Sequence, residues 1–156
     1  MNNEKLLTQL QQLSATLKAF QFGVGGSCLL WQLGLETSPN DIDIVCSEDD
    51  FAVICNELAA EYQLRDPPPH SEYATTHFAR FSRSGWPDIE LMAGIAVKTN
   101  GKMQRCQFNP QRCHWQNGIC WMPPADWLQL YQLFNRPQRV AQLRHYLVQL
   151  RLGSLS

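Results

Sequence analysis

The chain has 156 residues and a mass of 17.9 kDa, a length expected for one domain, since domains cluster at about 100–150 residues. Hydrophobic residues make up 44% of the sequence and charged residues 17%, which excludes an intrinsically disordered chain. The 13 Lys and Arg residues nearly balance the 14 Asp and Glu residues. A formal net charge of -1 disfavours a protein that binds long nucleic acids through their phosphates.

The hydropathy pattern gives no sign of membrane insertion or export. No uninterrupted apolar stretch approaches the roughly 18 residues of a membrane span, and polar residues interrupt the first 20 positions, unlike a secretory signal. We therefore expect a cytoplasmic protein. In a reducing compartment the six cysteines are expected to be free thiols.

The first third of the chain predicts a helix, a strand and a second helix. Residues 3–20 place leucines at three- and four-residue spacing, which is typical of an amphipathic helix. The apolar run 20–24 predicts a strand that ends in a turn at Gly25-Gly26-Ser27. Ser27 is expected to cap the helix that follows and stops at Gly34.

The middle of the chain predicts strands that carry acidic residues. Strict alternation over 41–47 puts Asp41 and Asp43 on one face of a strand. Residues 49–63 predict a helix with acidic residues at its start, where the helix dipole favours them. The segments 77–83 and 88–97 flank a Ser-Gly-Trp-Pro turn, which is the pattern of a β-hairpin.

The last third is irregular over residues 101–122, with short strand-like pieces, and becomes helical from Pro123. A break at 135–137 divides this part into two C-terminal helices. The order of elements predicts an α+β fold with a small mixed β-sheet flanked by helices. We expect residues 1–156 to form a single domain, with a core at 20–100 and the irregular segment and two helices at 101–156.

Three sequence features together indicate phosphate and metal chemistry. The Gly25-Gly26-Ser27 turn leaves backbone N–H groups unhindered for phosphate oxygens. Asp41 and Asp43 repel each other on one strand face, and a divalent cation such as Mg²⁺ removes that repulsion. The segment 88–90 places two more acids, Asp88 and Glu90, on one face of a later strand, where a third carboxylate would complete a two-metal site.

The run VGGSCLLWQLGLETSPNDIDIV resembles the signature of the polymerase-β-like nucleotidyltransferase superfamily: an apolar strand, a glycine turn, a helix and Asp-x-Asp on the next strand. The later ELMAGI segment is similar to the strand that carries that superfamily's third carboxylate. The resemblance covers residues 20–97. It is greatest to the small stand-alone enzymes, such as the lincosamide and aminoglycoside nucleotidyltransferases.

The resemblance implies a nucleotidyltransferase-like sheet and a role for each of these residues. Gly25, Gly26 and Ser27 would contact a nucleoside triphosphate, either ATP or another NTP. Asp41 and Asp43 would bind Mg²⁺, with Mn²⁺ as an alternative. Glu90 or Asp88 would complete the metal site or act as the general base, and the acid–apolar–apolar–Gly pattern favours Glu90.

The implied reaction is Mg²⁺-dependent transfer of a nucleoside monophosphate to a hydroxyl acceptor with release of pyrophosphate. The favoured donor is ATP, from which AMP is transferred. A small-molecule acceptor is favoured over nucleic acid, and family precedent suggests a homodimer through the C-terminal helices. The alternative is a degenerate, antitoxin-like or regulatory member that binds nucleotide or a protein partner without catalysis. Asn40, Gln132 and Gln138 replace charged residues of many stand-alone members and favour this alternative. A purely structural protein is a third hypothesis.

Several other residues carry weaker hypotheses. A zinc site at residues 106–120 would lack the usual close cysteine pair, so a thiol cluster is favoured. His77 and Arg80 could contact a nucleotide, but a solvated strand face is favoured for them. The C-terminal arginines could contact phosphate, but a solvated position is favoured for them as well. The loop 72–76 and the Pro-Pro-Pro-His segment 67–70 are together a candidate lid, and Trp86 and Trp115 are candidates for stacking on a base or sugar. The zinc candidates are Cys106, Cys113, His114 and Cys120, and the C-terminal arginines are Arg136, Arg139, Arg144 and Arg151.

Overall fold

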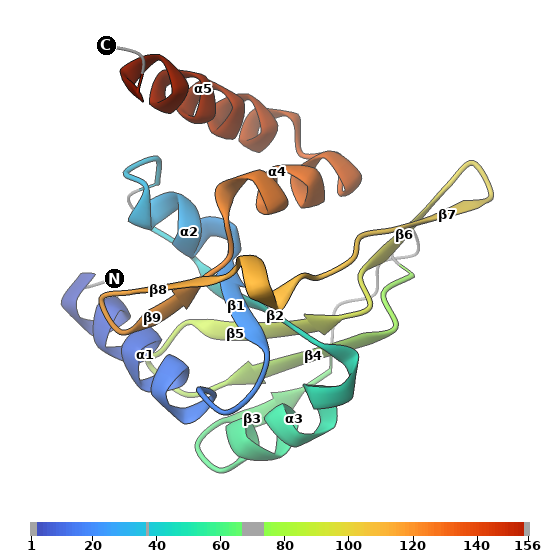
Figure 1. Cartoon of the computed structure of the whole chain (residues 1–156). Coiled ribbons are helices and arrows are strands. Elements are labelled where there is room, and N and C mark those ends of the chain that lie inside the picture. Colours follow the sequence, from blue (N-terminus) through green and yellow to red (C-terminus); the bar gives the residue numbers. More distant parts are fainter. Residues whose placement is uncertain (1–2, 37, 67–73, 155–156) are drawn as a thin grey trace.

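The computed structural model describes residues 3–36, 38–66 and 74–154. Its centre is a seven-stranded mixed sheet in the order β3-β4-β5-β2-β1-β9-β8, with a separate two-stranded hairpin, β6-β7 (Figure 1). The strands of the main sheet are β1 (Phe22–Gly25), β2 (Asp41–Cys46), β3 (Gln63–Arg65), β4 (His77–Ser82), β5 (Asp88–Ala93), β8 (His114–Gln116) and β9 (Ile119–Trp121). The hairpin is formed by β6 (Ala96–Thr99) and β7 (Lys102–Arg105).

Helices cover both faces of this sheet. In Figure 1, α1 and α3 lie below it, and α4 and α5 lie above it. The helices are α1 (Asn3–Thr16), α2 (Gly26–Gln32), α3 (Phe51–Ala59), α4 (Pro124–Leu133) and α5 (Pro137–Ser154), with 3₁₀ turns at Glu48–Asp50 and Pro110–Arg112. The predicted α+β class, mixed sheet and pair of C-terminal helices are confirmed.

Alternation along β2 and β5 separates the core from the polar face. Ile42 and Ile44 of β2 and Ile89 and Leu91 of β5 are fully buried, and α1 adds a stripe of buried leucines. The acidic residues between these apolar positions point to the opposite face of the sheet. The hydrophobic effect therefore fixes the direction in which the acids point, because a one-residue slip would bury them.

The predicted hairpin is confirmed, since β4 and β5 pair antiparallel from His77↔Ala93 to Phe81↔Ile89. The strand β5 also pairs in parallel with β2, and β1 pairs antiparallel with β2. These pairings place the two acid-bearing strands side by side in the middle of the sheet.

Some predicted boundaries were wrong. The first helix ends at Thr16, and the helix expected over 49–63 is a 3₁₀ turn followed by α3, which ends at Ala59 before β3. The short strand-like pieces expected within the irregular segment 101–122 are the strands β7, β8 and β9, and β9 joins the main sheet in parallel with β1, which was not predicted. Both β7 and β8 are exposed along their whole length, so they show no alternation that sequence reasoning can detect.

Two further expectations concern the thiols and the membrane. All six cysteines are free, as predicted. Within the described ranges, no helix combines the length and the apolar character that crossing a bilayer requires.

Candidate functional site

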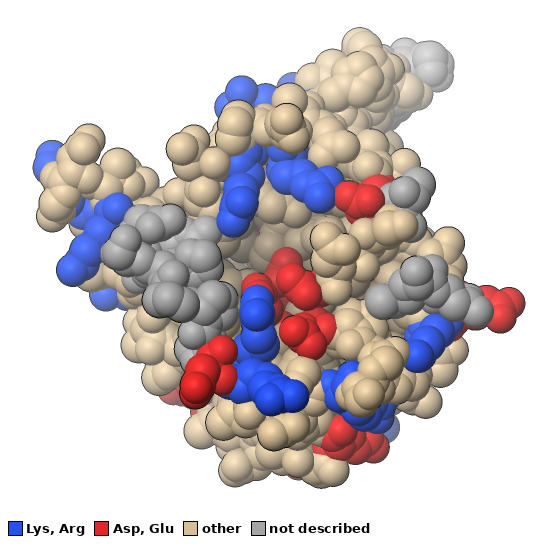
Figure 2. Space-filling view, turned by 180° about the vertical axis from the view of Figure 1, so that it is seen from behind, with Lys and Arg blue, Asp and Glu red and all other residues tan. Residues whose placement is uncertain are grey.

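A hollow of about 330 Å³ opens on the polar face of the sheet. Figure 2 shows acidic side chains at its floor, with basic side chains gathered above and beside them. The acids come from β2 and β5, and the upper rim comes from α4, α5 and the turn between these helices. The lining residues are Ser27, Asn40, Asp41, Asp43, Phe78, Glu90, Met92, Trp127, Tyr131, Phe134, Arg136 and Arg139.

One row of directly paired residues crosses the sheet at this hollow. Its members, in strand order, are Arg65, Arg80, Glu90, Asp43 and Gly25. Directly paired residues point their side chains to the same face of a sheet. At its centre the row brings the carboxylates of Asp43 and Glu90 together with the guanidinium of Arg80, and the strand of Asp43 is distant in sequence from the hairpin that carries the other two.

The third carboxylate of the hollow is Glu90 rather than Asp88. Both residues point to the polar face of β5, in register with Asp43 and Asp41 of β2. Glu90 lines the hollow with these two acids, whereas Asp88 lines a neighbouring pocket with Arg83 and Ser84. Of the two candidates that the sequence left open, the geometry places Glu90 with Asp41 and Asp43.

The two glycines of the turn are required by close neighbours. A Cβ atom on Gly25 would lie 2.5 Å from Cε3 of Trp127, so a side chain here would collide with the indole of α4. Gly26 has a φ of 63°, in the left-handed region, and a Cβ atom there would lie 2.0 Å from Oδ2 of Asp43. The glycines thus allow Trp127 and Asp43 to approach the start of α2.

Ser27 does not cap α2 as expected. The helix begins one residue earlier, at Gly26, and its N-cap is Gly25, which has no side chain. The Ser27 hydroxyl instead donates to the backbone carbonyl of Asp41, with 3.3 Å between Oγ and O. This bond ties the first turn of α2 to the acidic strand, and Ser27 still lines the hollow.

The carboxylates of the hollow are electrostatically unfavourable as a group. Burial, together with the nearby charges of Glu90 and Asp41 and a hydrogen bond to Glu90, raises the pKa of Asp43 well above its usual value of 3.8. Burial and Glu90 also raise the pKa of Asp41, and Arg80 partly offsets this rise. A site that holds its protons this tightly gains stability when a cation replaces them.

The fit to a divalent cation depends on Glu90. Carboxylate oxygens are the ligands that Mg²⁺ and Mn²⁺ prefer, so the donor chemistry of the hollow fits. Within the part of the chain that the structure describes, however, no three His, Cys, Asp or Glu side chains are arranged to hold a metal ion. Glu90 instead forms a short ion pair and hydrogen bond with the Arg80 guanidinium.

The four zinc candidates also lie within the described ranges, and they too are not arranged to hold a metal ion. The thiol of Cys120 donates to the backbone carbonyl of Phe22, with 3.3 Å between Sγ and O. Its interaction with Cys113, together with burial, raises the pKa of the Cys113 thiol. His114 is exposed on the edge strand β8, so two of the three thiols of the favoured cluster lie near each other and the histidine does not join them.

Two arginines of the C-terminal part belong to the site, although the sequence favoured solvated positions for them. Arg136 and Arg139 line the hollow from the start of α5 and the turn before it. Arg139 is positioned by an ion pair with Glu36, with 3.0 Å between Nη2 and Oε2. The sequence signal that points to them is their place beside the break at 135–137, which brings the start of α5 to the sheet.

The remaining candidates lie elsewhere. His77 stacks on Phe51 with 4.9 Å between ring centroids, away from the hollow. Lys5 and Arg83 lie over the ring of Trp86, and Trp115 is half exposed against Phe22. Most of the candidate lid, residues 67–70, 72 and 73, lies outside the residues that the structure describes.

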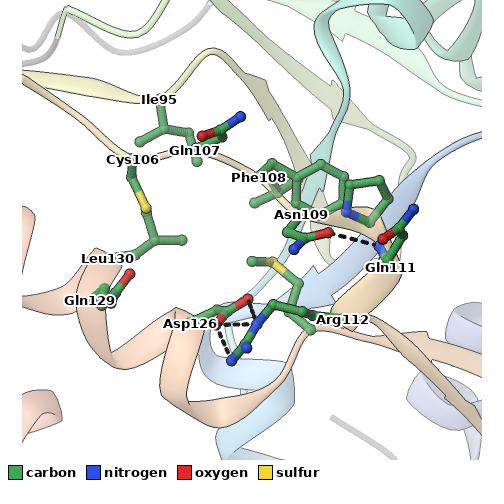
Figure 3. Close-up of a pocket in the computed structure, with 13 residues that line it drawn as sticks. Ile95, Cys106, Gln107, Phe108, Asn109, Gln111, Arg112, Asp126, Gln129 and Leu130 are labelled. Atoms are coloured by element: carbon green, nitrogen blue, oxygen red, sulfur yellow. Dashed lines mark hydrogen bonds and ion pairs between the residues drawn. The ribbon is translucent and has the colours of Figure 1, made fainter.

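A larger pocket of about 630 Å³ lies on the other side of α4 (Figure 3). Asp126 and Leu130 of α4 line it, whereas Trp127 and Tyr131 of the same helix line the hollow. Its walls carry amide side chains and the ion pair of Arg112 with Asp126, in which Nη2 and Oδ1 are 2.8 Å apart. It contains none of the acids of the hollow.

Comparison with known proteins supports the fold. No family model matches the sequence, and no curated protein matches it. The structure is similar to the crystal structure of a Thermotoga maritima protein that is provisionally named a nucleotidyltransferase, with a TM-score of 0.71 and 19% sequence identity over 96% of both chains. This mixed sheet with its five helices therefore has a nucleotidyltransferase-like fold.

Proposed function

We propose that this protein is a Mg²⁺-dependent nucleotidyltransferase that moves a nucleoside monophosphate to a hydroxyl acceptor. The favoured donor is ATP, from which AMP is transferred. The observation that carries the proposal is the convergence of Asp41, Asp43 and Glu90 in a hollow whose rim holds two arginines. Acids at the floor suit a metal ion, and arginines at the rim suit phosphate oxygens. The fold is one on which this chemistry is expected.

Each side chain has a defined task in the proposed reaction. Asp41, Asp43 and Glu90 would hold Mg²⁺ or Mn²⁺, while Arg136 and Arg139 would pair with the triphosphate. When bound, Mg²⁺ supplies charge neutralisation for the triphosphate and a lowered pKa for the acceptor hydroxyl.

The reaction itself is an in-line displacement at the α-phosphorus. The acceptor oxygen forms a bond to that phosphorus, the bond to the bridging oxygen breaks, and pyrophosphate leaves. The acceptor proton passes to a carboxylate of the hollow, for which Glu90 is the best placed candidate. A small-molecule acceptor, a homodimer through α4 and α5 and a cytoplasmic location remain predictions.

One observation favours a second candidate, a protein of the same fold that binds nucleotide or a protein partner without catalysis. The guanidinium of Arg80 is hydrogen-bonded to the Glu90 carboxylate, which is then not available to a metal ion. Asn40 lines the hollow at a position where many stand-alone enzymes have a basic residue. Such a protein would bind through the same hollow and produce no pyrophosphate.

A transfer assay separates the two candidates. The protein is incubated with Mg²⁺, each α-labelled NTP in turn and pools of hydroxyl-bearing small molecules, including aminoglycosides, lincosamides and sugars. We expect a labelled adduct and pyrophosphate from the wild-type protein, and a loss of about 10³-fold in Asp41→Asn, since a metal ligand is removed. Asp49→Asn removes an exposed carboxylate outside the hollow and is the matched control. Nucleotide binding without any adduct would favour the non-catalytic candidate.

A further inference from the structure

One acid of the hollow, Glu90, already has a cationic partner, the guanidinium of Arg80, which lies beside the hollow rather than in its lining. Arg80 of β4 lies directly opposite Glu90 of β5, and its Nη2 atom donates a short hydrogen bond to Oε1 of Glu90. The side chains of this pair are 27% and 19% exposed, so solvent screens them only partly. An ion pair in this setting is a stronger interaction than a pair on the open surface.

The bond to Glu90 is the main polar contact that the structure gives Arg80. Among the described residues, its buried Nε atom has no hydrogen-bond partner. The Glu90 hydrogen bond raises the pKa of Arg80, and the charges of Asp41 and Asp88 add to this effect. The guanidinium thus balances the charge of the acids without being fixed by a second side chain.

We propose that Arg80 is the resident counter-ion of the acidic hollow and that a divalent cation must displace it from Glu90 in order to bind. The inference rests on the proposed function, because it assumes that Asp41, Asp43 and Glu90 hold the metal. Arg80 is then a positioning residue that keeps Glu90 out of the metal site until the cation competes for it. This accounts for the absence of a three-ligand arrangement among the described residues.

The test is a titration of Mn²⁺ alone, followed by the electron paramagnetic resonance signal of the free ion, in mildly alkaline buffer. We expect Arg80→Gln to bind Mn²⁺ about tenfold more tightly than the wild-type protein, since the ion no longer has to break a charge-assisted hydrogen bond. Arg80→Lys keeps the charge and should stay close to the wild-type affinity. A purely structural role would predict the opposite sign, because a disturbed site binds metal more weakly.

Arg65→Gln is the matched control. Arg65 is the next residue of the row, directly opposite Arg80 on β3, and it is exposed. Its replacement removes the same charge one strand further from the acids and should leave Mn²⁺ affinity unchanged. Thermal unfolding of each variant shows that it is folded before it is titrated.

The outcomes are distinguishable. Wild-type binding with no gain in Arg80→Gln, or an equal gain in Arg80→Lys, overturns the counter-ion role and leaves the proposed function standing. Absence of Mn²⁺ binding in both the wild-type protein and Arg80→Gln overturns the metal site, and with it both proposals.

Discussion

Asp43→Asn is expected to lower the proposed nucleotidyl transfer by about 10³-fold or more, and at the same time to stabilise the protein without metal by about 0.5–2 kcal/mol. Asp43 carries the most unfavourable charge of the hollow, since burial and the neighbouring Glu90 raise its pKa well above 3.8. Asparagine keeps the shape of the side chain and removes the charge. A residue that costs stability where it stands is typical of a functional site.

The stability gain has a predicted pH dependence. Because the pKa of Asp43 is raised in the folded state, the folded protein binds this proton more tightly than the unfolded chain does. Wild-type stability therefore falls as pH rises from about 3.8 through the raised pKa, and Asp43→Asn lacks this loss. The advantage of the variant should be greatest at neutral and alkaline pH and vanish in acid.

Urea unfolding of the two proteins across a pH series measures the difference directly. Asp49→Asn provides the matched control, since this exposed acid lies outside the hollow. A variant that is less stable than the wild-type protein at neutral pH would show that Asp43 has a stabilising partner, and would contradict this account of the site.

Gly26→Ala is expected to destabilise the protein by about 2–4 kcal/mol and to abolish the proposed metal binding. Two effects add: alanine is strained at a φ of 63°, and its Cβ atom would lie 2.0 Å from Oδ2 of Asp43. The start of α2 or the Asp43 side chain must then move, and either movement disrupts the hollow.

The two effects can be separated at the two ends of the same helix. Gly34, just beyond the end of α2, has a φ of 80°, and a Cβ atom on it would meet no other atom within 4 Å. Gly34→Ala therefore reports the backbone strain alone, about 1 kcal/mol. The double variant Gly26→Ala/Asp43→Ala should recover part of the loss, because the colliding carboxylate is gone. Equal effects of Gly26→Ala and Gly34→Ala in chemical unfolding would show that Asp43 does not approach the turn as described.

The acid-bearing strands and their orientation could be predicted from the sequence because one physical constraint governs each of them. Burial of Ile42 and Ile44 forces Asp41 and Asp43 to the other face of β2, and the same alternation applies around Glu90 in β5. The glycine turn was detectable for a similar reason, since few residues other than glycine tolerate its geometry.

The rest of the site depends on strand register and on helix packing, which the sequence pattern does not fix. The β4–β5 hairpin was predicted, and alternation shows which face Arg80 points to, but the register that places Arg80 opposite Glu90 is seen only in the structure. The break at 135–137 marks where the chain turns, but it does not show that α4 lies over the sheet and α5 packs against α4, which brings Arg136 and Arg139 to the hollow. The position and pairing of strand β9 were not predicted, because a strand of three residues is too short to show a period.

Calorimetric titration can show whether the acidic hollow binds a metal–nucleotide complex, on which both proposals depend. ATP, CTP, GTP and UTP are each titrated, with and without Mg²⁺, into the wild-type protein and into Asp41→Ala/Asp43→Ala. We expect Mg²⁺-dependent binding of at least one nucleotide to the wild-type protein and loss of this binding in the folded double variant. If the folded wild-type protein binds none of the four, with or without Mg²⁺, the hollow is not a metal–nucleotide site.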